Sequence, residues 1–345
     1  MIPIATLKEI AKIAKVSSST VSRVLSSDYS FSVSEETRRT VIEVARSLNY
    51  RHKPGKKKNE LDEGRKWNVG VLFWCSEQFE LTDPFYMSIR QGIEKECDNQ
   101  GLTIKRIYRW SDEDSSTIED SEIDGLIVVG KVECIFHSKR PDMPIVFVDH
   151  CSSVEHDSVQ FDAAVAARKT MEHLLHFGYD RIGYIGGNSY IRTLEGINYY
   201  EDERQQMYKR MLEEQGKFKL EDMFVGSWGV EDGYKLMSVA IKNGNLPRAF
   251  FVASDLLAIG ALRALHESEI KVPEQVAIAS IDGIDVSKYV NPPLTTVKVY
   301  TEEMGSTGVK LMVDRLLGRN YALHVMVETE LMIRESCGSL IFHPI

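Results

Sequence analysis

Cysteine is scarce in this 345-residue sequence, and what there is lies scattered. The five cysteines are odd in number, far apart along the chain and never arranged as CxxC. The sequence therefore predicts neither a disulfide framework nor a zinc site, and we expect no bound metal or cofactor. A chain that needs no disulfides fits a reducing compartment, so we expect it in the cytoplasm.

Long hydrophobic runs and the signatures of common enzymes are also missing. No apolar run reaches the roughly 18 residues of a membrane-spanning helix, and the first residues show no signal-peptide pattern. The sequence contains no P-loop, HExxH or GxSxG pattern, and Gly183–Gly187 lacks the full dinucleotide-binding spacing. We therefore predict no catalytic residue, no enzyme activity and no membrane contact.

Positive charge is concentrated at one end of an otherwise acidic chain. Residues 1–58 contain 12 Lys and Arg against 5 Asp and Glu, a net charge of +7. The whole chain carries −9, which leaves −16 for the remainder. This asymmetry indicates a contact with a polyanion that is confined to the N-terminal part.

The stretch from Thr6 to Arg23 predicts two short helices joined by a tight turn. Thr6 can cap the first helix while Glu9 reaches back to its start, and apolar residues then recur at helical spacing. Ser17 and Ser18 offer a new cap for a second helix. Two short helices joined in this way are typical of a helix-turn-helix, although another kind of helical hairpin could share the pattern.

The start of that second helix carries side chains suited to reading DNA. In a helix-turn-helix these first residues face the base edges of the major groove. Small hydroxyl side chains let the helix approach closely, and arginine pairs well with O6 and N7 of guanine. The predicted DNA-binding residues of this motif are Thr6, Ser17, Ser18, Ser19, Thr20, Ser22 and Arg23.

A third helix and a linker follow the motif. Ser34 can cap a helix whose first turn holds two glutamates, where the helix dipole favours acidic residues. This helix would complete a three-helix domain near Tyr50. Residues 51–66 then contain a Pro-Gly pair and three consecutive lysines, which is typical of a linker. The expected phosphate contacts in this linker are Lys56, Lys57 and Lys58, although the segment could equally be a solvated tether.

After Asn68 the sequence alternates between apolar runs of strand length and amphipathic helices. This alternation predicts parallel, doubly wound sheets, and it is long enough that we expect two similar lobes. The predicted strands cover residues 69–74, 102–108, 125–129, 145–148, 181–187, 249–254 and 276–281. The predicted helices cover residues 84–100, 163–177, 201–215, 231–243 and 255–268.

Polar and aromatic residues follow several of these strands, where parallel sheets bind their ligands. Carboxylates accept hydrogen bonds from neighbouring hydroxyls, and arginine can donate two parallel hydrogen bonds. An indole can cover the C–H face of a sugar. This mixture predicts a neutral polyol ligand, although an aspartate after a strand is often a helix cap, as we expect of Asp255. The candidate effector-binding residues are Trp74, Arg90, Lys131, Asp149, Arg204, Trp228, Ser254 and Asp282.

Several strings resemble one family of regulators. ATLKEIAKIAKVSSSTVSRVL and VSEETRRTVIEVARSLNY resemble the DNA-binding domain of the lactose-repressor/galactose-repressor family. RIGYIGG, FVASDLLAIGALRALHE, NPPLTTVKVYTEEMG and TELMIRES resemble its effector-binding core, which has a fold like that of periplasmic sugar-binding proteins. TDPFYMSIRQGIEKE with VVGK resembles the galactoside branch. The resemblance implies a phosphate contact at Ser34 and effector contacts at Asp149, Arg204, Trp228, Ser254 and Asp282.

The sequence departs from the family pattern in its effector positions. Ser254 stands where asparagine is frequent, and Gly283 stands where a second aspartate is frequent. Val299 and Tyr300 occupy positions where polar contacts are common. These departures leave the hydroxyl pattern of the sugar open.

The linker and the C-terminus depart from it as well. Family members usually insert a hinge-helix leucine into the minor groove. The candidate here, Leu61, is flanked by three acidic residues, so we expect no leucine wedge. No leucine heptads follow Arg334, so we expect a dimer without a tetramerising tail.

Together these features predict a homodimeric, sugar-regulated repressor of the α/β class. We expect a three-helix helix-turn-helix domain at 1–52, a hinge at 53–66 and a two-lobed core at 67–338. Lobe one would comprise residues 67–161 and 293–322, and lobe two residues 162–292 and 323–338. Galactose or a β-galactoside would release the protein from operator DNA. Two alternatives stay open: a corepressor-type catabolite regulator, and a sugar sensor whose basic head only tethers it.

Overall fold

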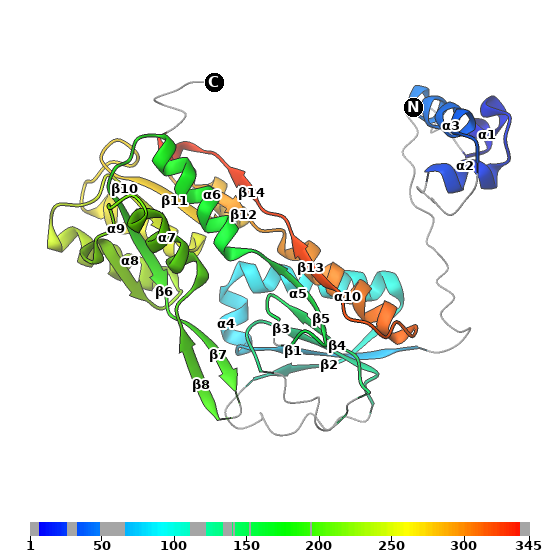
Figure 1. The fold of residues 1–345 in the computed structure, drawn as a ribbon, viewed down its shortest axis with the longest axis horizontal. Helices are drawn as coiled ribbons and strands as arrows, with labels where there is room; N and C mark the ends of the chain where they lie inside the picture. Colours follow the sequence, from blue (N-terminus) through cyan, green and yellow to red (C-terminus); the bar gives the residue numbers. More distant parts are fainter. Residues whose placement is uncertain are drawn as a thin grey trace. The chain divides into compact units, whose positions relative to one another are not determined.

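The structure is a computed structural model that describes residues 7–25, 33–48, 66–110, 122–133, 140, 142–151, 153–193 and 195–338. Its internal contacts divide the chain into two units, residues 1–65 and residues 66–345. The described part of the first unit is helical, and that of the second unit alternates between strands and helices, as Figure 1 shows.

The first unit packs three helices around a small apolar core. They are α1 (Leu7–Ala14), α2 (Ser18–Leu25) and α3 (Glu35–Ser47). Each helix contributes two buried residues spaced one, three or four apart, so that each presents one apolar stripe. These buried residues are Ile10, Ala11, Val21, Val24, Val41 and Ala45. The predicted three helices are confirmed within the described residues.

A left-handed residue makes the turn between α1 and α2. Lys15 has φ 54°, and the N–H of Val16 donates to the carbonyl oxygen of Ala11 at 3.1 Å. One residue in this conformation ends a helix and redirects the chain sharply. The second helix can therefore start at Ser18, as the serine pair predicted.

The second unit contains two six-stranded sheets, one in each lobe. The sheet of lobe one is parallel throughout, in the order β13-β5-β4-β3-β1-β2. Its strands are β1 (Asn68–Phe73), β2 (Thr103–Arg109), β3 (Gly125–Val129), β4 (Ile145–Val148), β5 (Asp157–Phe161) and β13 (His324–Val327). Its helices are α4 (Glu77–Thr82), α5 (Pro84–Gln100) and α10 (Thr301–Leu316).

The sheet of lobe two has the order β14-β12-β11-β10-β6-β9, and only β14 runs antiparallel to its neighbour. Its strands are β6 (Ile182–Gly187), β9 (Met223–Gly226), β10 (Ala249–Val252), β11 (Ala277–Asp282), β12 (Thr295–Lys298) and β14 (Glu330–Met332). The helices are α6 (Ala163–His176), α7 (Glu203–Glu213), α8 (Val230–Asn243) and α9 (Asp255–Glu267), and short 3-10 turns occupy Leu220–Asp222, Asp285–Lys288 and Glu335–Cys337.

The central strands are buried on both faces, which is why they read as continuous apolar runs. All residues of β3, GLIVV, and of β4, IVFV, are buried. The predicted limits of β3, β4 and α5 agree with the structure residue by residue. The other predicted strands and helices of the core are present with their ends shifted by up to two residues.

The strand pairing moves two of the predicted lobe boundaries. Residues 293–298 were assigned to lobe one, but β12 pairs with β11 and β14 in the sheet of lobe two. Residues 323–327 were assigned to lobe two, but β13 pairs with β5 in lobe one. The chain therefore crosses between the lobes after β5, after β12 and after β13, and the last crossing is visible in Figure 1.

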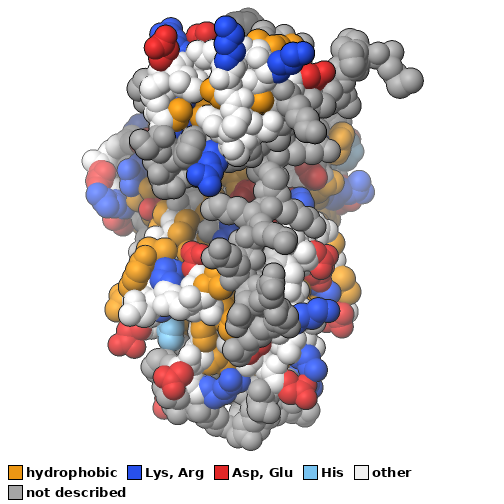
Figure 2. Space-filling view, turned by 90° about the vertical axis from the view of Figure 1, so that its right-hand side faces the viewer, with side chains coloured by type: hydrophobic (Ala, Val, Ile, Leu, Met, Phe, Trp, Pro, Cys, Tyr) orange, Lys and Arg blue, Asp and Glu red, His pale blue; other side chains and the backbone are white. Residues whose placement is uncertain are grey.

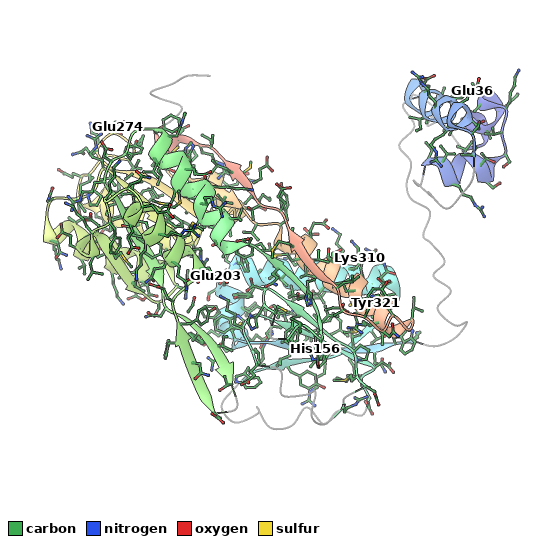
Figure 3. The ribbon with its side chains drawn as sticks, in the orientation of Figure 1. Glu36, His156, Glu203, Glu274, Lys310 and Tyr321 are labelled. Carbon is green, nitrogen blue, oxygen red and sulfur yellow. The ribbon has the colours of Figure 1, made fainter. Side chains whose placement is uncertain are left out.

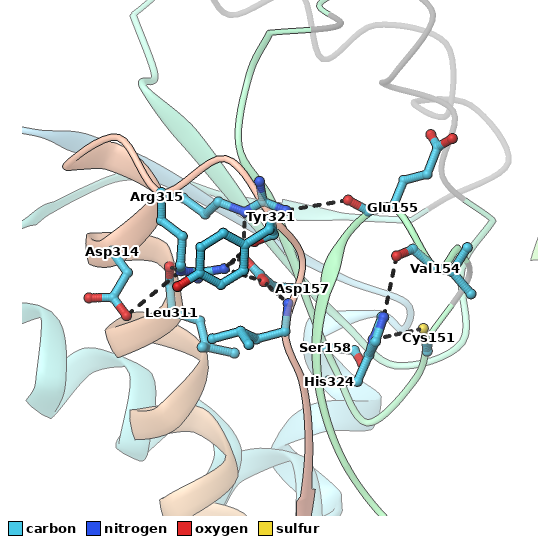
Figure 4. Close-up of polar contacts among 12 residues, drawn as sticks. Cys151, Val154, Glu155, Asp157, Ser158, Leu311, Asp314, Arg315, Tyr321 and His324 are labelled. Carbon is cyan, nitrogen blue, oxygen red and sulfur yellow. Dashed lines mark hydrogen bonds and ion pairs between the residues drawn. The ribbon is translucent and has the colours of Figure 1, made fainter.

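Asp157 is the buried first residue of β5, and it links this strand to the end of α10. Asp157 accepts hydrogen bonds from Arg315 Nε at 2.7 Å, Arg319 Nη1 at 2.8 Å and the N–H of Leu323 at 2.6 Å (Figure 4). Burial opposes ionisation of this carboxyl, but the two guanidinium groups outweigh it and hold the pKa of Asp157 below its ordinary value. This contact fixes the turn that leads from α10 into β13.

No helix in the described part of the chain is long and apolar enough to cross a membrane. Side chains of both charge signs are interspersed with hydrophobic ones on the face in Figure 2.

Candidate functional site

Ser17 caps the second helix of the N-terminal unit. Its Oγ accepts from the N–H of Thr20 at 3.0 Å and lies 2.7 Å from Ser19 Oγ. The cap satisfies a backbone donor that a helix start otherwise leaves unpaired. Ser18, Ser19 and Arg23 are exposed along the helix that follows, so these three predicted base-reading side chains are accessible.

Ser34 caps α3 in the same way. Its Oγ accepts from the N–H of Thr37 at 3.2 Å, which confirms the predicted cap, and the side chain is exposed. Other predicted DNA contacts lie outside the described residues: Thr6, Lys56, Lys57 and the side chain of Ser22.

A cavity of about 330 Å³ lies between the two lobes of the second unit. It opens at the carboxyl ends of both sheets, where doubly wound folds bind their ligands. Figure 3 labels Glu203, which lines this cavity from the start of α7 where the lobes meet. The predicted effector residues brought together here are Trp74, Lys131, Asp149, Arg204, Trp228, Ser254 and Asp282.

Arg204 is held by a fork of hydrogen bonds to one carboxylate. Its Nε donates to Asp202 Oδ1 at 2.7 Å, and its Nη2 donates to Asp202 Oδ2 at 2.9 Å. Its Nη1 donates to the carbonyl oxygen of Ala253 at 3.1 Å, and the guanidinium lies 4.4 Å from the ring centre of Trp228. Burial opposes ionisation of Asp202, but Arg204 outweighs it and lowers the pKa of this carboxyl far below its ordinary value.

Asp149 faces the cavity from the end of β4. Its Oδ2 accepts from the hydroxyl of Tyr86 at 3.1 Å, and its backbone has φ 70°. Loss of solvent raises the pKa of Asp149 to about 6, although Lys131 works in the opposite direction. Burial likewise raises the pKa of Asp83 to about 6. A carboxylate in such a wall can accept hydrogen bonds from ligand hydroxyl groups.

The helix cap after β10 is Ser254 and not the expected Asp255. Ser254 Oγ accepts from the N–H of Leu257 at 3.2 Å. Asp255 is fully buried instead, and it accepts from Ser280 Oγ at 2.5 Å, Thr296 Oγ1 at 2.6 Å and the N–H of Ile284 at 2.9 Å. Asp255 therefore anchors the loop after β11.

Asp282 combines a ligand-facing position with a structural contact. Its Oδ2 accepts from the N–H of Asp255 at 3.1 Å, and its φ is 126°. Burial and the neighbouring Asp255 carboxyl raise the pKa of Asp282 well above its ordinary value. Non-glycine residues with such backbone angles are concentrated at functional sites, and both Asp149 and Asp282 line the cavity.

Arg90 is not among the residues that line the cavity, contrary to the prediction. Its Nε donates to Glu94 Oε1 at 2.7 Å, and its Nη1 lies 3.5 Å from Glu80 Oε1. These two carboxylates hold the guanidinium between α4 and α5. The guanidinium of Arg90 thus contacts carboxylates of lobe one and not the cavity.

A β-hairpin that the sequence analysis did not predict supplies further cavity residues. It consists of β7 (Ser189–Thr193) and β8 (Gly196–Tyr200), and Tyr190, Ile191 and Tyr200 line the cavity. Two runs rich in β-branched and aromatic residues, separated by a short turn with a glycine, are a hairpin signal that was available in the sequence. No group of three or more His, Cys, Asp or Glu in the described residues is arranged to hold a metal ion.

Comparison with known proteins identifies the family to which the chain belongs. Residues 6–53 match the description "Bacterial regulatory proteins, lacI family", and residues 171–337 match "Periplasmic binding protein-like domain". The HTH-type transcriptional repressor MelR of Bacillus subtilis (strain 168) is 42% identical over 340 residues, which cover 96% of this chain and 97% of MelR. The chain belongs to the LacI family.

Other LacI family relatives match over nearly the whole chain. The HTH-type transcriptional regulator GalR of Streptococcus thermophilus is 36% identical over 337 residues, covering 96% of this chain and 99% of GalR. GanR of Bacillus subtilis (strain 168) is 35% identical over 346 residues, covering 96% and 99%. The chain is therefore a helix-turn-helix transcriptional regulator and not an enzyme.

Solved structures share the fold. A transcriptional regulator CelR–cellobiose complex has a TM-score of 0.68 at 25% identity and covers 96% of this chain and 99% of CelR. A lac repressor dimer bound to operator and the anti-inducer ONPF has a TM-score of 0.67 at 22% identity, covering 97% and 99%. The predicted combination of a helix-turn-helix domain with a two-lobed α/β core is confirmed.

Proposed function

We propose that this protein represses an operon for the use of galactose or a β-galactoside and leaves its operator when that sugar binds between the lobes. The observation that carries the proposal is the arginine fork in the interlobe cavity. Arg204 is fixed by Asp202 and lies against Trp228, with the carboxylates Asp149 and Asp282 lining the same cavity. Fixed donors, carboxylate acceptors and an indole face suit a neutral sugar.

The relatives support a sugar as the ligand. One relative is named GalR, and the CelR structure, described as a cellobiose complex, holds a sugar other than a galactoside. For this chain we assign the effector contacts to Trp74, Lys131, Asp149, Arg204, Trp228, Ser254 and Asp282, and we leave Arg90 out.

For DNA binding, we assign residues 1–52 to the DNA-binding domain and residues 53–66 to the hinge. A homodimer would place one α2 helix in each half-site of a pseudo-palindromic operator. We expect the protein to bind this DNA in the bacterial cytoplasm. The proposed contacts are Thr6, Ser17, Ser18, Ser19, Thr20, Ser22, Arg23, Ser34, Lys56 and Lys57. Exposure of Ser18, Ser19 and Arg23 supports this assignment.

The proposed switch is a shift between two conformations of the core. A sugar can shift this equilibrium only as far as its affinity for the two conformations differs. Contacts from both lobes to one ligand would provide that difference, because they form together only when the lobes close.

A gel shift with operator DNA, with and without galactose and lactose, tests the proposal. We expect either sugar to release the DNA, and we expect Trp228→Leu to bind DNA normally but to need more sugar. Sugar that tightens binding would instead indicate a corepressor mechanism. DNA binding that no sugar changes would contradict the proposed switch.

A further inference from the structure

The hairpin β7–β8 belongs to lobe two but forms backbone hydrogen bonds with lobe one. The N–H of Arg192 donates to the carbonyl oxygen of Lys131 at 3.1 Å, and the N–H of Glu133 donates to the carbonyl oxygen of Arg192 at 2.8 Å. Val132 and Arg192 thereby form a parallel bridge. Figure 1 shows the hairpin extending away from β6 alongside lobe one. The bridge therefore connects the lobes in addition to the covalent chain crossings.

On the side of lobe one, the bridge is attached to the core of the lobe. Val132 is 1% exposed and belongs to the same apolar cluster as Leu72 of β1 and Phe147 of β4. Residues in such a cluster do not shift singly, because protein interiors are closely packed. Lobe one therefore cannot move away from the hairpin without breaking the hydrogen bonds to Arg192.

On the side of lobe two, the hairpin is attached at its base. Ser189 Oγ donates to Asp202 Oδ2 at 2.6 Å, and Asp202 is the carboxylate that holds Arg204. The N–H of Asn188, directly before the hairpin, donates to the carbonyl oxygen of Gly226 in β9 at 2.8 Å. The hairpin is thus fixed to lobe two at its base and to lobe one farther along β7.

Side chains add contacts across the same boundary between the lobes. The ring of Tyr190 lies 5.5 Å from the ring of Trp74 at an interplanar angle of 67°, an edge-to-face arrangement. Lys131 Nζ lies 4.9 Å from the ring centre of Tyr200. Aromatic pairs and cation–π contacts of this kind are attractive. Each joins a hairpin residue to a residue of lobe one, so both are lost when the lobes separate.

Arg192 can form the bridge because its backbone groups point away from β8. In an antiparallel pair, the N–H and C=O groups of successive residues point alternately toward and away from the partner strand. Arg192 is paired with Ile197, and its N–H and carbonyl oxygen bond to lobe one. The N–H of Ile197 therefore points to the opposite edge of the hairpin. It follows that the N–H of Arg192 stabilises the contact between the lobes and not the hairpin itself.

We propose that hairpin β7–β8 is a strap between the lobes, which sets how readily they close on each other. The strap favours the closed arrangement, so the amount of sugar needed to release DNA depends on it. This second part rests on the proposed function, whereas the first part concerns the lobes alone. Ligand affinity falls with the fraction of molecules in the binding-competent conformation, so a weaker strap weakens every sugar by the same factor.

Arg192→Pro tests the strap, with Arg192→Ala as its matched control. Both variants remove the side chain, but only proline also removes the N–H that donates to Lys131. Ile197→Pro makes the same backbone change at the opposite edge of the hairpin, where proline is tolerated. Neither Arg192 nor Ile197 is among the residues that line the cavity, so the sugar contacts stay in place.

Hydrogen exchange at the amide of Glu133 measures opening of the bridge in the full-length protein without sugar. We expect Arg192→Pro to accelerate this exchange roughly three- to tenfold relative to Arg192→Ala, the range that one backbone hydrogen bond gives. Ile197→Pro should leave the exchange at Glu133 unchanged. Melting temperatures of the three variants report any loss of folding.

Calorimetric titration with galactose and with lactose measures the effect of the strap on sugar binding. We expect Arg192→Pro to weaken both sugars by the same factor, up to about tenfold, relative to Arg192→Ala. Unequal weakening would show that the hairpin acts by contacting the ligand, which contradicts the strap. Unchanged affinity for both sugars would contradict the part of the proposal that concerns DNA release.

The exchange measurement keeps the strap separate from the proposed function. Equal exchange at Glu133 in Arg192→Pro and Arg192→Ala would show that the bridge does not hold the lobes, and the proposal would be wrong. Equally fast exchange in Ile197→Pro would show that the bridge opens with the whole hairpin, which also contradicts it. If exchange changes as expected but neither sugar binds, the proposed function fails and the strap between the lobes stands.

Discussion

Arg204 shows how a side chain can be positioned before a ligand arrives. Its side chain is only 13% exposed, and it is held by Asp202, by the carbonyl oxygen of Ala253 and by the face of Trp228. This geometry requires the planar guanidinium with its several donors, because the ammonium group of lysine carries the same charge at a single point. The charge and the fork can therefore be tested separately.

We expect Arg204→Lys to bind operator DNA but to need roughly ten- to a hundredfold more sugar for release, since charge-assisted hydrogen bonds contribute about 1.5–3 kcal/mol each. Arg204→Ala should also destabilise the core by about 3–5 kcal/mol, because it leaves Asp202 buried without its partner. Gel shifts and thermal melts check both variants. Normal sugar release by Arg204→Lys would place the sugar elsewhere in the cavity.

Protonation of Asp149 should make sugar binding depend on pH. With its pKa at about 6, roughly a tenth of this carboxyl stays ionised at pH 5, so we expect affinity about tenfold weaker there than at pH 7.5. His150 does not titrate in this range, because burial lowers its pKa to about 4. Titrations at both pH values measure the effect, and Asp149→Asn should reduce it, leaving the shares of Asp83 and Asp282, whose pKa values burial also raises.

The same raised pKa affects stability in the opposite direction. The folded protein binds a proton at Asp149 that the unfolded chain has already released between about pH 4 and 6. The contribution of this group to stability therefore falls as the pH rises through that window. At neutral pH, the buried carboxylate at this sugar site therefore lowers the free energy of unfolding.

At the scale of elements, each lobe brings two helices together at a pair of glycines. In lobe one, a Cβ on Gly92 of α5 would lie 2.0 Å from the carbonyl oxygen of Glu302, and one on Gly305 of α10 would lie 2.1 Å from that of Ile89. In lobe two, Gly233 of α8 and Gly260 of α9 make the same kind of backbone contact. Backbone atoms cannot rotate away, so a side chain here must push the helices apart.

We expect Gly305→Ala to lower the free energy of unfolding by about 1–3 kcal/mol, since overpacking outweighs the gain in helix propensity. Gly226→Ala, in strand β9, is a control without a close backbone contact, because its Cβ would meet Leu236 at 3.4 Å, an ordinary contact distance. Urea unfolding of both variants measures the difference. Equal stability of the two would show that α5 and α10 can separate without cost.

At the scale of the whole molecule, positive charge is concentrated in the first 58 residues, and the rest of the chain is acidic. The net charge of residues 1–58 is +7 and that of the remainder is −16, so attraction to DNA comes from the N-terminal part. The acidic core would repel DNA, which helps to confine contact to the head.

Operator affinity should therefore be strongly dependent on salt. For a dimer that makes several phosphate contacts, we expect a loss of about tenfold or more between 50 and 200 mM salt, because bound cations are released from the DNA. Gel shifts at three salt concentrations give the slope. A flat profile would show that phosphate contacts contribute little, and it would contradict the role given to the basic head.

The sequence by itself determined the local features of this protein. The caps at Ser17 and Ser34 depend on hydrogen bonds that span three residues, so short strings predict them. The limits of β3 and β4 follow from apolar runs that are bounded by aspartate, glycine or proline. The same local reasoning predicted that residues after the strands meet in one cavity, because parallel strands end at one edge.

Only the tertiary structure decided which distant segments meet. The pairing of β12 and β13 with opposite sheets, the anchoring role of Asp255 and the pairing of Arg90 with Glu80 each join residues from separate elements. The contact of hairpin β7–β8 with Lys131 and Glu133 joins segments about 60 residues apart, from different lobes. Periodicity and capping report the environment of a residue along its own element, whereas these contacts depend on how the elements pack.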